Sequence, residues 1–585
     1  MKTNITMKRI ISLIIAAVAV AASCCGPKDG EYTLRILTTN DVHGHYFDSL
    51  YTSDQTGPSM MALAWYIDSV RVAAGKENVV LIDAGDSMHG DNASYFFNYV
   101  DTESEHVFAR MLEYLDYDAW IPGNHDFETG HPVYDRVVAG LDVPVLAANA
   151  IRVETGESYF REYVVVKRHG LKIAIVGFTN PNIKNAYEPV LWLGIDFESL
   201  IPDFTQNVVN RVREKENPDV VIVAIHSGAG RGDGSQLEQQ GLDLFKSLEG
   251  VDVIVSAHDH RVNAQQSETI AMVNTGNYCS NLGYATVTVT VENGKVTGKK
   301  VSAELIPVNK DNVDEEMKSC FQDDYAKVKA YTTRPVGELK TDLNGSDALA
   351  GMSDYVNLLH TICLNASEAQ VSFAAPLSPN VSVKSGKMVY NDLFTLYPYE
   401  NELYEVRMTG KEIKSYLEHS YDGWINTLDK DQEHILKMRG FTNPRTGTQM
   451  WFFTATASNL DSAGGLVYDV DVTKPVGERI AIRSFADGSA FDESAEYKVA
   501  MTSYRARGGG ELLEKAGVDT KNIEERMTAR YADIRSLIDA YLAENGEISS
   551  EAIGDKSLIG EWKFIPEAKA RKVLDQDVKL VAPRR

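Results

Sequence analysis

Five short segments in the first half of the chain carry carboxylates, imidazoles and an amide in an order that suits metal chemistry. Mixed nitrogen and oxygen donors suit zinc, manganese or iron-type ions, and they suit calcium poorly. Ten of the thirteen histidines precede residue 300, so any histidine-based metal chemistry belongs to this half. The segments are Asp41-Val42-His43, Gly85-Asp86, Gly123-Asn124-His125-Asp126, His226 and His258-Asp259-His260.

The chemistry that these residue types allow is a site for two divalent metal ions. Asp41 and His43 form a close carboxylate–imidazole pair, and Asp86 can bridge two ions with its two oxygens. Two such ions about 3.5–4 Å apart clamp the attacking and leaving oxygens of a phosphoryl displacement. Each motif alone also fits a solvated loop or a hydrogen-bonded histidine, and it is the ordered set that indicates a metal site.

The elements that must position these residues are strands of an α/β layer fold. Each segment follows an apolar run, and helical spacing lies between several of these runs, over Met60–Val72 and Val107–Leu115. Because open α/β sheets bind ligands at the carboxyl ends of their strands, the loops should meet in one crevice. The expected strands are Leu34–Thr39, Val79–Ile82, Leu171–Val176, Val220–Ile225 and Val251–Val255.

A second region begins near Pro335 and mixes helices with strands, which predicts an α+β domain. Before it, Asp311–Tyr331 is polar and free of Gly and Pro, which predicts an exposed helix that links two domains; a helix packed on the first domain is the alternative. Thr528–Asn545 is expected to be a helix. Other helices are expected over Leu349–Leu364 and Lys411–His419, and strands over Leu403–Met408, Tyr468–Val472, Arg479–Ser484 and Tyr497–Thr502.

Charge and length restrict the class of protein. The 585 residues are enough for roughly two to four domains. The formal net charge of −25 argues against a binder of nucleic-acid polymers, because such proteins neutralise phosphates with Lys and Arg. A small anionic ligand remains compatible with this charge, since bound metal ions can reverse the local field. Nothing in the sequence predicts an oligomeric state.

The N-terminus is typical of an export signal. Lys2, Lys8 and Arg9 precede the apolar run Ile10–Ala22, which is shorter than the about 20 residues that span a bilayer. The small residues before Cys24 resemble a bacterial lipobox. That resemblance implies a signal peptide over residues 1–23 and a lipid anchor on Cys24 that holds an exported, periplasmic or cell-surface protein at a membrane. Ordinary cleavage nearby, with Cys24 incidental, is the alternative.

The five segments resemble the calcineurin-like metallophosphatases, whose pattern is DxH, GD, GNHD/E, H and GHxH; here Ala257 replaces the usual glycine before the last histidine pair. The resemblance implies that His125 stabilises charge on the phosphoryl group and protonates the leaving alkoxide. Glu128 stands where a carboxylate normally orients this histidine, and Asp126 is an alternative partner. One ion would bind Asp41, His43, Asp86 and His260, and the other Asp86, Asn124, His226 and His258.

The second region resembles the C-terminal domain of the secreted 5′-nucleotidase family, through Met388–Gly410 and Ser503–Gly510. By this resemblance Tyr399 and Tyr504 sandwich the base of a nucleotide, as flat rings stack on any base. The alternative is that both tyrosines are core or turn residues. Gly508 and Gly509 would permit close approach of the backbone to a ligand. Asn401, Arg505 and Arg507 would contact the base edge, ribose or phosphate, with a surface role as the alternative for the two arginines.

The resemblance covers the chain from about Leu34 to Pro566 and implies hydrolysis of nucleotides outside the cytoplasm. The expected activity is that of a two-metal phosphohydrolase of the 5′-nucleotidase type. The cyclic-phosphodiesterase and 3′-nucleotidase branch, toward which Asn459-Leu460-Asp461 leans, is an alternative, and Ser372 stands where an arginine motif is usual in the 5′-nucleotidases. Cleavage of UDP-sugars and nucleotide capture without turnover are further alternatives. The expected plan is a four-layer α/β-sandwich metallophosphatase domain, a helical linker about which the second domain rotates, and the α+β substrate-binding domain. Its bounds are a signal peptide over 1–23, then 31–308, 309–333 and 334–566, followed by a tail over 567–585.

Overall fold

The computed structural model describes residues 26–53, 55–429, 433–442, 447–454 and 457–582. The signal peptide expected over residues 1–23 and Cys24 lie outside these residues. Contacts divide the chain into two units, Met1–Lys329 and Ala330–Arg585. Along the described part of the chain, no helix combines the length and the apolar character that crossing a membrane requires.

Two β-sheets form the centre of the first unit. Their facing sides share one core, to which Ile36 and Val80 contribute from one sheet and Ile175 and Ile222 from the other. The first sheet has the order β13 (Lys295–Pro307), β12 (Asn281–Glu292), β1 (Gly30–Thr39), β2 (Val79–Asp83) and β3 (Ala119–Trp120). The second has the order β10 (Val262–Gln266), β11 (Ala271–Thr275), β9 (Val253–Val255), β8 (Val220–Ile225), β6 (Leu171–Phe178) and β5 (Tyr163–Arg168).

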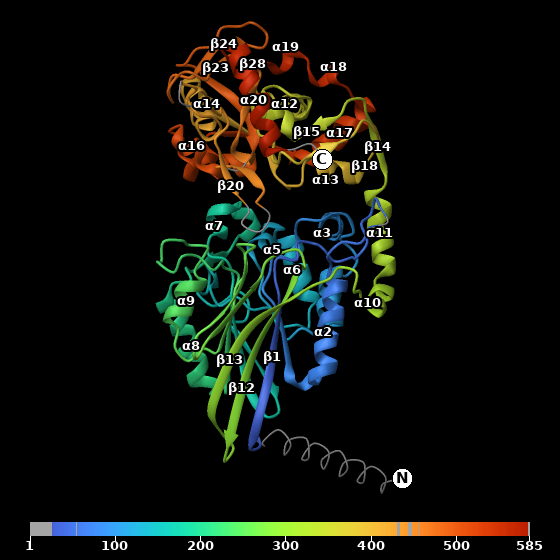
Figure 1. The fold of residues 1–585 in the computed structure, drawn as a ribbon, viewed down its shortest axis with the longest axis vertical. Coiled ribbons are helices and arrows are strands. Elements are labelled where there is room, and N and C mark those ends of the chain that lie inside the picture. Colours follow the sequence, from blue (N-terminus) through green and yellow to red (C-terminus); the bar gives the residue numbers. More distant parts are fainter. Residues whose placement is uncertain (1–25, 54, 430–432, 443–446, 455–456, 583–585) are drawn as a thin grey trace. The chain divides into compact units, whose positions relative to one another are not determined.

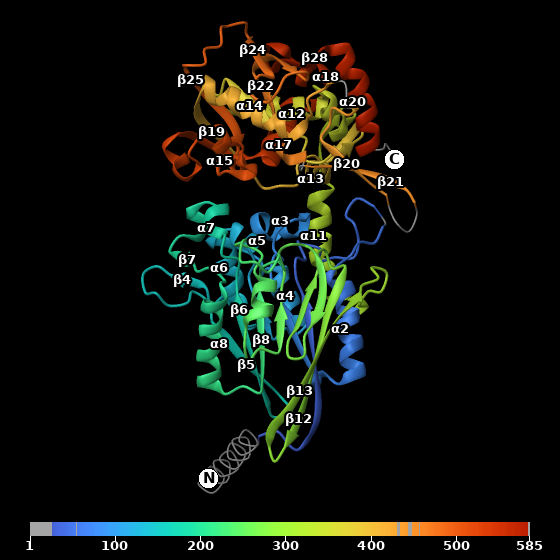
Figure 2. The same ribbon diagram turned by 60° about the vertical axis from the view of Figure 1, so that its left-hand side comes forward.

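Helices cover the outer faces of both sheets (Figure 1). On one side lie α2 (Met60–Ala74), which begins at the capping residue Ser59, and α4 (Val107–Tyr114). On the other side α8 (Pro202–Glu216) and α9 (Gly241–Ser247) pack on β8 through a separate apolar core. Figure 2 shows α8 beside β5 and β6, with α2 on the opposite side of the unit. The expected four-layer α/β sandwich is therefore confirmed.

The strand directions place the predicted metal ligands. β1 pairs in parallel with β2, and β2 with β3. In the other sheet β6, β8 and β9 are parallel to one another. Each strand that precedes a candidate ligand therefore ends at the same edge of its sheet as its neighbours.

The second unit is built on a five-stranded sheet of β22 (Ser462–Gly464), β16 (Val371–Ala374), β25 (Glu496–Thr502), β19 (Glu402–Thr409) and β26 (Met527–Asp533). A three-stranded sheet joins β24 (Ile480–Phe485), β23 (Leu466–Asp471) and β28 (Gly560–Ile565), and another joins β18 (Gly386–Val389), β14 (Pro335–Leu339) and β27 (Glu547–Ile548). The main helices are α12 (Asp354–Ala366), α14 (Gly410–Trp424) and α17 (Ile534–Asn545). The α+β class expected for this region is confirmed.

The segment expected to be an exposed linker helix is instead two helices packed on the first unit. The helices are α10 (Glu315–Cys320) and α11 (Gln322–Thr332), and the buried residues are Met317 on α10, Phe321 between the helices and Val328 on α11. Their charged residues pair with the same unit, for example Lys318 Nζ with Asp48 Oδ2 at 2.6 Å. The alternative weighed for this segment, a helix packed on the first domain, is thus the correct one, because its polar residues have ion-pair partners there.

The C-terminal third differs from expectation at two places. Residues 527–533 form the edge strand β26, which pairs antiparallel with β19, and helix α17 begins only after the capping residue Asp533. The segment expected to be a tail is the helix α20 (Glu567–Val581). Ala570 and Leu574 on this helix belong to the core of the second unit, so it is an integral part of that unit.

Candidate metal centre

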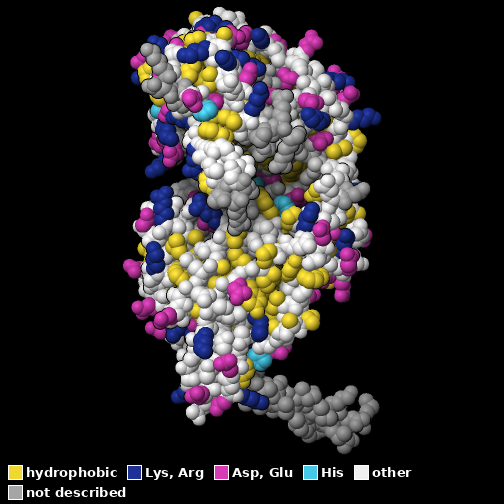
Figure 3. Space-filling model, in the orientation of Figure 1, with side chains coloured by type: hydrophobic (Ala, Val, Ile, Leu, Met, Phe, Trp, Pro, Cys, Tyr) yellow, Lys and Arg dark blue, Asp and Glu magenta, His cyan; other side chains and the backbone are white. Residues whose placement is uncertain are grey.

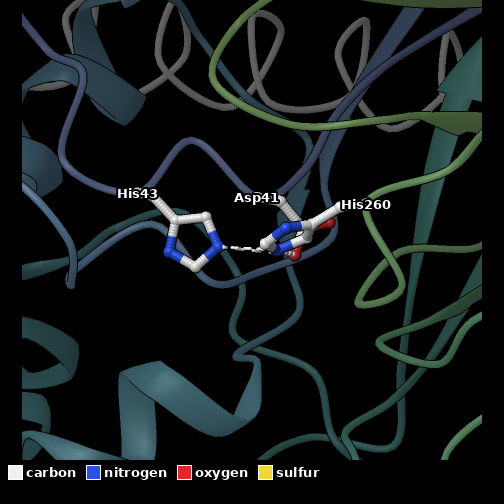
Figure 4. Close-up of side chains that lie close together, drawn as sticks. All are labelled: Asp41, His43 and His260. Carbon is white, nitrogen blue, oxygen red and sulfur yellow. Dashed lines mark hydrogen bonds and ion pairs between the residues drawn. The ribbon is translucent and has the colours of Figure 1, made fainter. Parts of the chain in front are cut away.

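The five ligand-bearing loops meet at the carboxyl ends of β1, β2, β3, β8 and β9. Asp41, His43 and His260 form a first cluster, in which the Nε2 atoms of His43 and His260 are 3.0 Å apart. Asp41 Oδ1 lies 3.4 Å from His260 Nε2 and 3.8 Å from His43 Nε2. Figure 4 shows the two imidazoles pointing toward each other beside the Asp41 carboxylate.

A second cluster lies on the neighbouring loops. It consists of Asp86, His226 and His258, with His226 Nε2 at 3.0 Å from Asp86 Oδ2. Asn124 follows Gly123 beside this cluster, and its amide nitrogen donates to the Tyr187 hydroxyl at 2.9 Å. The structure thus brings six of the seven expected ligands into two adjacent groups, with Asn124 beside the second. The sharing of Asp86 between two ions stays a prediction.

The loop backbones are held in conformations that non-glycine residues rarely adopt. Asp41, His43, Asp86, His258 and His260 all have φ between 49° and 73°. Such strain persists only where the surroundings hold it, and it concentrates at functional sites. Backbone hydrogen bonds from Asp41 to Gly85 (2.8 Å) and from His43 to Asp86 (2.9 Å) fasten the first loop to the second.

Two glycines allow the loops to approach each other. A Cβ atom on Gly85 would lie 2.4 Å from the Gly123 nitrogen, and one on Gly123 would lie 2.2 Å from Asp86 Oδ1. Only glycine fits at both positions, which explains the GD and GNH spacing. Ala257, which replaces the family's usual glycine, is not among the described residues with positive φ, so a methyl group is tolerated there.

The donor set fits two cations. Nδ1 of His43 donates to the His89 carbonyl at 3.1 Å, and Nδ1 of His226 donates to the Ala84 carbonyl at 2.6 Å. In the neutral rings the Nε2 lone pairs therefore face the carboxylates. Three buried ligand atoms have no hydrogen-bond partner among the described residues: Asp41 Oδ1, Asp86 Oδ2 and His226 Nε2. Lone pairs that face one another without a donor are costly unless a cation lies between them.

The pKa values agree with this reading for two of the ligands. Burial lowers the pKa of His43 to about 3 despite the raising effect of Asp86, so its lone pair is available at neutral pH. Burial raises the pKa of Asp86, but His226 and His125 outweigh it and hold the pKa well below its usual value. Asp86 is therefore an ionised carboxylate.

His125 and Glu128 form a hydrogen-bonded imidazole–carboxylate pair beside the clusters. His125 Nδ1 lies 2.5 Å from Glu128 Oε2, and the backbone N–H of His125 donates to Asp86 Oδ1 at 2.8 Å. Burial lowers the pKa of His125, but Asp86 and Glu128 outweigh it and raise the pKa to about 10. With Nδ1 held by Glu128, the ring can act as a proton donor through Nε2.

Asp126 has a different task from Glu128. Its carboxylate is fully buried and accepts the backbone N–H groups of Asp86, Ser87, Met88 and Gly123 at 2.8–3.0 Å. Asp126 therefore shapes the two ligand loops and does not contact the His125 ring, so its alternative assignment as the partner of that ring is wrong.

Asp126→Ala should destabilise the first unit by at least about 3 kcal/mol, because it leaves buried N–H groups without acceptors. The measurement is thermal unfolding with excess metal, compared with Glu128→Gln as a control that removes no acceptor of these loops. An unfolding midpoint within one degree of the wild type would contradict this role.

Three residues at the site were not predicted from the sequence. The His89 ring stacks on the His125 ring, and the Tyr187 hydroxyl lies 3.3 Å from His125 Nδ1. The centroid of the Tyr278 ring lies 5.6 Å from that of the His43 ring. A signal for His89 was present, since it lies three residues after Asp86 on a ligand loop. Four other histidines of this unit hydrogen-bond to partners outside the clusters: His45, His106, His131 and His169.

The two tyrosines predicted to bind a base are exposed in the second unit. Tyr399 is 44% exposed and Tyr504 is 46% exposed, so neither is a core residue. Burial raises the pKa of Tyr399 and the nearby Tyr504 adds to this rise, which places the two side chains within electrostatic range. Gly509 lies close to the Tyr504 ring, since a Cβ atom at this position would come within 2.5 Å of it. Gly508, with φ of 95°, adopts the conformation that glycine favours.

The remaining predicted contacts divide into two kinds. Arg505 is buried, and all five of its N–H donors bond within the protein, to Asp461, Asn459, Ser458 and Gly509. The prediction that Arg505 contacts a ligand, and its surface alternative, are therefore both wrong. Arg507 pairs with Glu524 at 3.1 Å, whereas Asn401 donates to the Tyr397 hydroxyl at 3.2 Å and its ligand contact stays a prediction.

The surface agrees with the charge of the sequence. Figure 3 shows basic and acidic side chains interspersed on the displayed face of each unit.

Comparisons with known sequences match both units. The family of calcineurin-like phosphoesterases matches residues 34–262, and the 5′-nucleotidase C-terminal domain matches residues 335–515. A 5′-nucleotidase of Vibrio vulnificus is 26% identical, over 94% of this chain and 100% of that protein. A 2′,3′-cyclic-nucleotide 2′-phosphodiesterase/3′-nucleotidase of Salmonella typhimurium is 25% identical, over 85% of this chain and 84% of that protein.

Two further similarities concern length and fold. A trifunctional nucleotide phosphoesterase of Bacillus subtilis is 24% identical over 86% of this chain, and the match spans only 37% of that longer protein. The crystal structure of a putative 5′-nucleotidase from Staphylococcus aureus superposes with a TM-score of 0.72 at 19% identity, over 91% of this chain and 99% of that one. This structural likeness shows that the fold is shared.

Proposed function

Because this chain belongs to the 5′-nucleotidase family, with a calcineurin-like phosphoesterase domain and a 5′-nucleotidase C-terminal domain, we propose that it hydrolyses phosphate esters of nucleotides. Nucleoside 5′-monophosphates are the expected substrates. The observation that carries the proposal is the pair of adjacent clusters, Asp41–His43–His260 and Asp86–His226–His258. Three of their buried atoms, one of them on each of Asp41, Asp86 and His226, have no hydrogen-bond partner among the described residues. A phosphoester is the substrate class that such a site, with His125 beside it, suits best.

In this proposal Asp41, His43, Asp86 and His260 hold one divalent ion, and Asp86, Asn124, His226 and His258 hold the other. Zinc, manganese or a similar ion suits these nitrogen and oxygen donors. When bound, the ions supply the positive charge that neutralises the phosphoryl oxygens and activates water for attack.

The residues of the chain itself have separate tasks. His125 donates a hydrogen bond to the phosphoryl group and a proton to the leaving alkoxide, through the Nε2 atom that Glu128 leaves free. Glu128 holds Nδ1 at 2.5 Å, which sets the tautomer and the orientation of the ring. Asp126 keeps the ligand loops in place through the four backbone N–H groups that it accepts.

Base recognition is assigned to Tyr399 and Tyr504. Their exposure and the close approach of Gly509 to the Tyr504 ring favour a stacking platform, and stacking is tolerant of base identity. Asn401 and the backbone of Gly508 and Gly509 are further candidates for ligand contacts.

Tyr399→Ala and Tyr504→Ala should each raise KM for a nucleotide about tenfold, because stacking contributes about 1–3 kcal/mol per base. The Tyr→Phe variants keep the ring and should differ from the wild type by less than about threefold. Steady-state kinetics with AMP measures both, and ribose 5-phosphate, which has no base, is the control substrate. Equal losses with both substrates would contradict stacking on the base.

A panel of AMP, 3′-AMP, 2′,3′-cyclic AMP and UDP-glucose, assayed with added manganese or zinc, tests the proposed activity. Fastest release of phosphate from AMP supports the 5′ assignment. If the metal-loaded protein binds nucleotides but releases no phosphate, the proposed hydrolase activity is refuted and nucleotide capture is supported.

A second candidate is the 2′,3′-cyclic phosphodiesterase and 3′-nucleotidase activity on the same scaffold. It is favoured by Asn459-Leu460-Asp461 and by the similarity to the Salmonella protein that is named for these activities. In the structure Asp461 is the carboxylate that holds Arg505, at 2.9 Å. Preferred turnover of 2′,3′-cyclic AMP and 3′-AMP in the panel would select this candidate, and preferred turnover of UDP-glucose would select the third, a UDP-sugar hydrolase.

We also propose that the chain is exported and held at a membrane by a lipid on Cys24. The basis is the sequence alone, with its basic start, short apolar run and small residues before the cysteine. Incorporation of labelled fatty acid into the wild type, and its loss in Cys24→Ala, is the expected result. Labelling that persists in Cys24→Ala would contradict the assignment.

A further inference from the structure

His89 is a further imidazole beside the metal clusters, and the mechanism described above makes no use of it. It lies on the loop that follows β2, three residues after Asp86, and its side chain is 9% exposed. Together with His125 and Glu128 it forms a group whose nitrogen and oxygen atoms lie within 4.8 Å of one another.

The backbone around His89 is held from both sides. The His89 carbonyl accepts from His43 Nδ1 at 3.1 Å. On the preceding residue, the Met88 N–H donates to Asp126 at 2.9 Å and the Met88 carbonyl accepts from Asn98 at 2.7 Å. A Cβ atom on Gly90 would lie 3.0 Å from His43 Cβ, so the chain passes close to the first cluster. These contacts fix the backbone from which the His89 side chain projects.

The His89 ring lies flat against the His125 ring. The centroids are 4.6 Å apart and the planes differ by 16°, so the two imidazoles are stacked. The other rings around His125 meet it edge-on, namely those of His43 at 5.5 Å and of Tyr187 at 6.1 Å. His89 is thus the described residue that supports a face of the His125 ring.

Both rings also face one carboxylate. Glu128 Oε2 is 2.5 Å from His125 Nδ1 and 3.9 Å from His89 Nε2. Glu128 holds one edge of the His125 ring, and stacking by His89 opposes tilting of the ring out of its plane. The two contacts act at right angles, and together they restrict the ring more than the hydrogen bond alone would.

We propose that His89 is a positioning residue for His125: it stacks on one face of the His125 ring, beside the carboxylate that both histidines share, and so aligns the ring for its reaction. This inference rests on the proposed role of His125 as a proton donor. Alignment of this kind acts on the chemical step and leaves substrate binding unchanged, because a displaced catalytic group lowers the rate without removing a substrate contact.

The test compares His89→Ala, which removes the stacked ring, with His89→Phe, which keeps a flat ring but no nitrogen. His89→Ala should lower kcat for the best substrate of the panel about tenfold to a hundredfold. KM should stay within about twofold and the metal content should equal that of the wild type. His89→Phe should recover most of the lost rate, and His131→Ala, on the surface of the same unit, is the matched control.

A double-mutant cycle separates positioning from a direct effect. In a His125→Ala background, His89→Ala should cause no further loss, because the residue through which it acts is already gone. Equal losses in both backgrounds, a His89→Phe variant as slow as His89→Ala, or fewer metal ions in His89→Ala at unchanged stability would each overturn the inference.

A second measurement does not depend on activity. In protein labelled with ¹⁵N-histidine, the Nδ1 proton of His125 should give a resonance that exchanges slowly with water and is missing in His125→Ala. Faster exchange of this proton in His89→Ala supports positioning, and an unchanged rate overturns it. A wild type that hydrolyses none of the panel would refute the proposed function, whereas an active wild type with an equally active His89→Ala variant would refute only this inference.

Discussion

Replacement of Asp86 by asparagine is expected to lower kcat/KM for a nucleotide by about three orders of magnitude or more. The carboxylate is buried, and its Oδ2 faces His226 Nε2 at 3.0 Å while Oδ1 accepts the His125 N–H at 2.8 Å. An asparagine can keep the second contact, but it loses the negative charge that two cations require. The loss should therefore come with fewer than two metal ions per chain.

Metal content by mass spectrometry and kinetics at saturating manganese check this prediction. Asp135→Asn is the matched control, since Asp135 pairs with His131 at the surface of the same unit. A variant that retains two ions and at least a tenth of the wild-type rate would contradict the assignment of Asp86 as the shared ligand.

The second large effect is expected for His125. His125→Asn should lower kcat about 10²–10⁴-fold, the usual contribution of a positioned acid or base, with both metal ions retained. The physical reason is that the ring is aimed by Glu128 at 2.5 Å and is not itself a member of either metal cluster. Glu128→Gln should lower kcat in the same direction by a smaller factor, because glutamine still accepts from Nδ1 but without charge.

The leaving group provides a control for this prediction. p-Nitrophenolate departs without a proton, so His125→Asn should impair hydrolysis of p-nitrophenyl phosphate less than hydrolysis of AMP. Equal factors for the two substrates would assign His125 to stabilisation of the phosphoryl group alone. A His125→Asn variant with wild-type turnover of AMP would refute its role altogether.

Some features could be predicted from local sequence. The strands that end at Thr39, Asp83 and Ile225 are apolar runs, and each is followed within a few residues by a ligand candidate. Because parallel strands end at a common edge, the meeting of these loops follows from chain order and periodicity. Gly85 and Gly123 lie where two of these loops approach each other closely, and such an approach requires residues without side chains.

Other features depended on contacts between distant segments. Glu128 and Asp126 are chemically similar and lie two residues apart, yet one faces the His125 ring and the other faces four backbone N–H groups. Sequence patterns specify residue types and do not specify which way a side chain turns at the end of a short helix. The stacking of His89 on His125 depends likewise on how two loops approach each other.

The sequence by itself determined the α/β class of the first unit, the α+β class of the second and the set of candidate metal ligands. These follow from periodicity and from strand ends, which are local properties of the chain. The tertiary structure alone decided that α10 and α11 pack on the first unit and that residues 567–581 complete the core of the second. It also decided that Arg505 forms a salt bridge with Asp461. For α10, α11 and Arg505 the deciding energy is that of pairing charged groups, and for residues 567–581 it is that of burying apolar side chains. In each case the partners lie far away in the sequence.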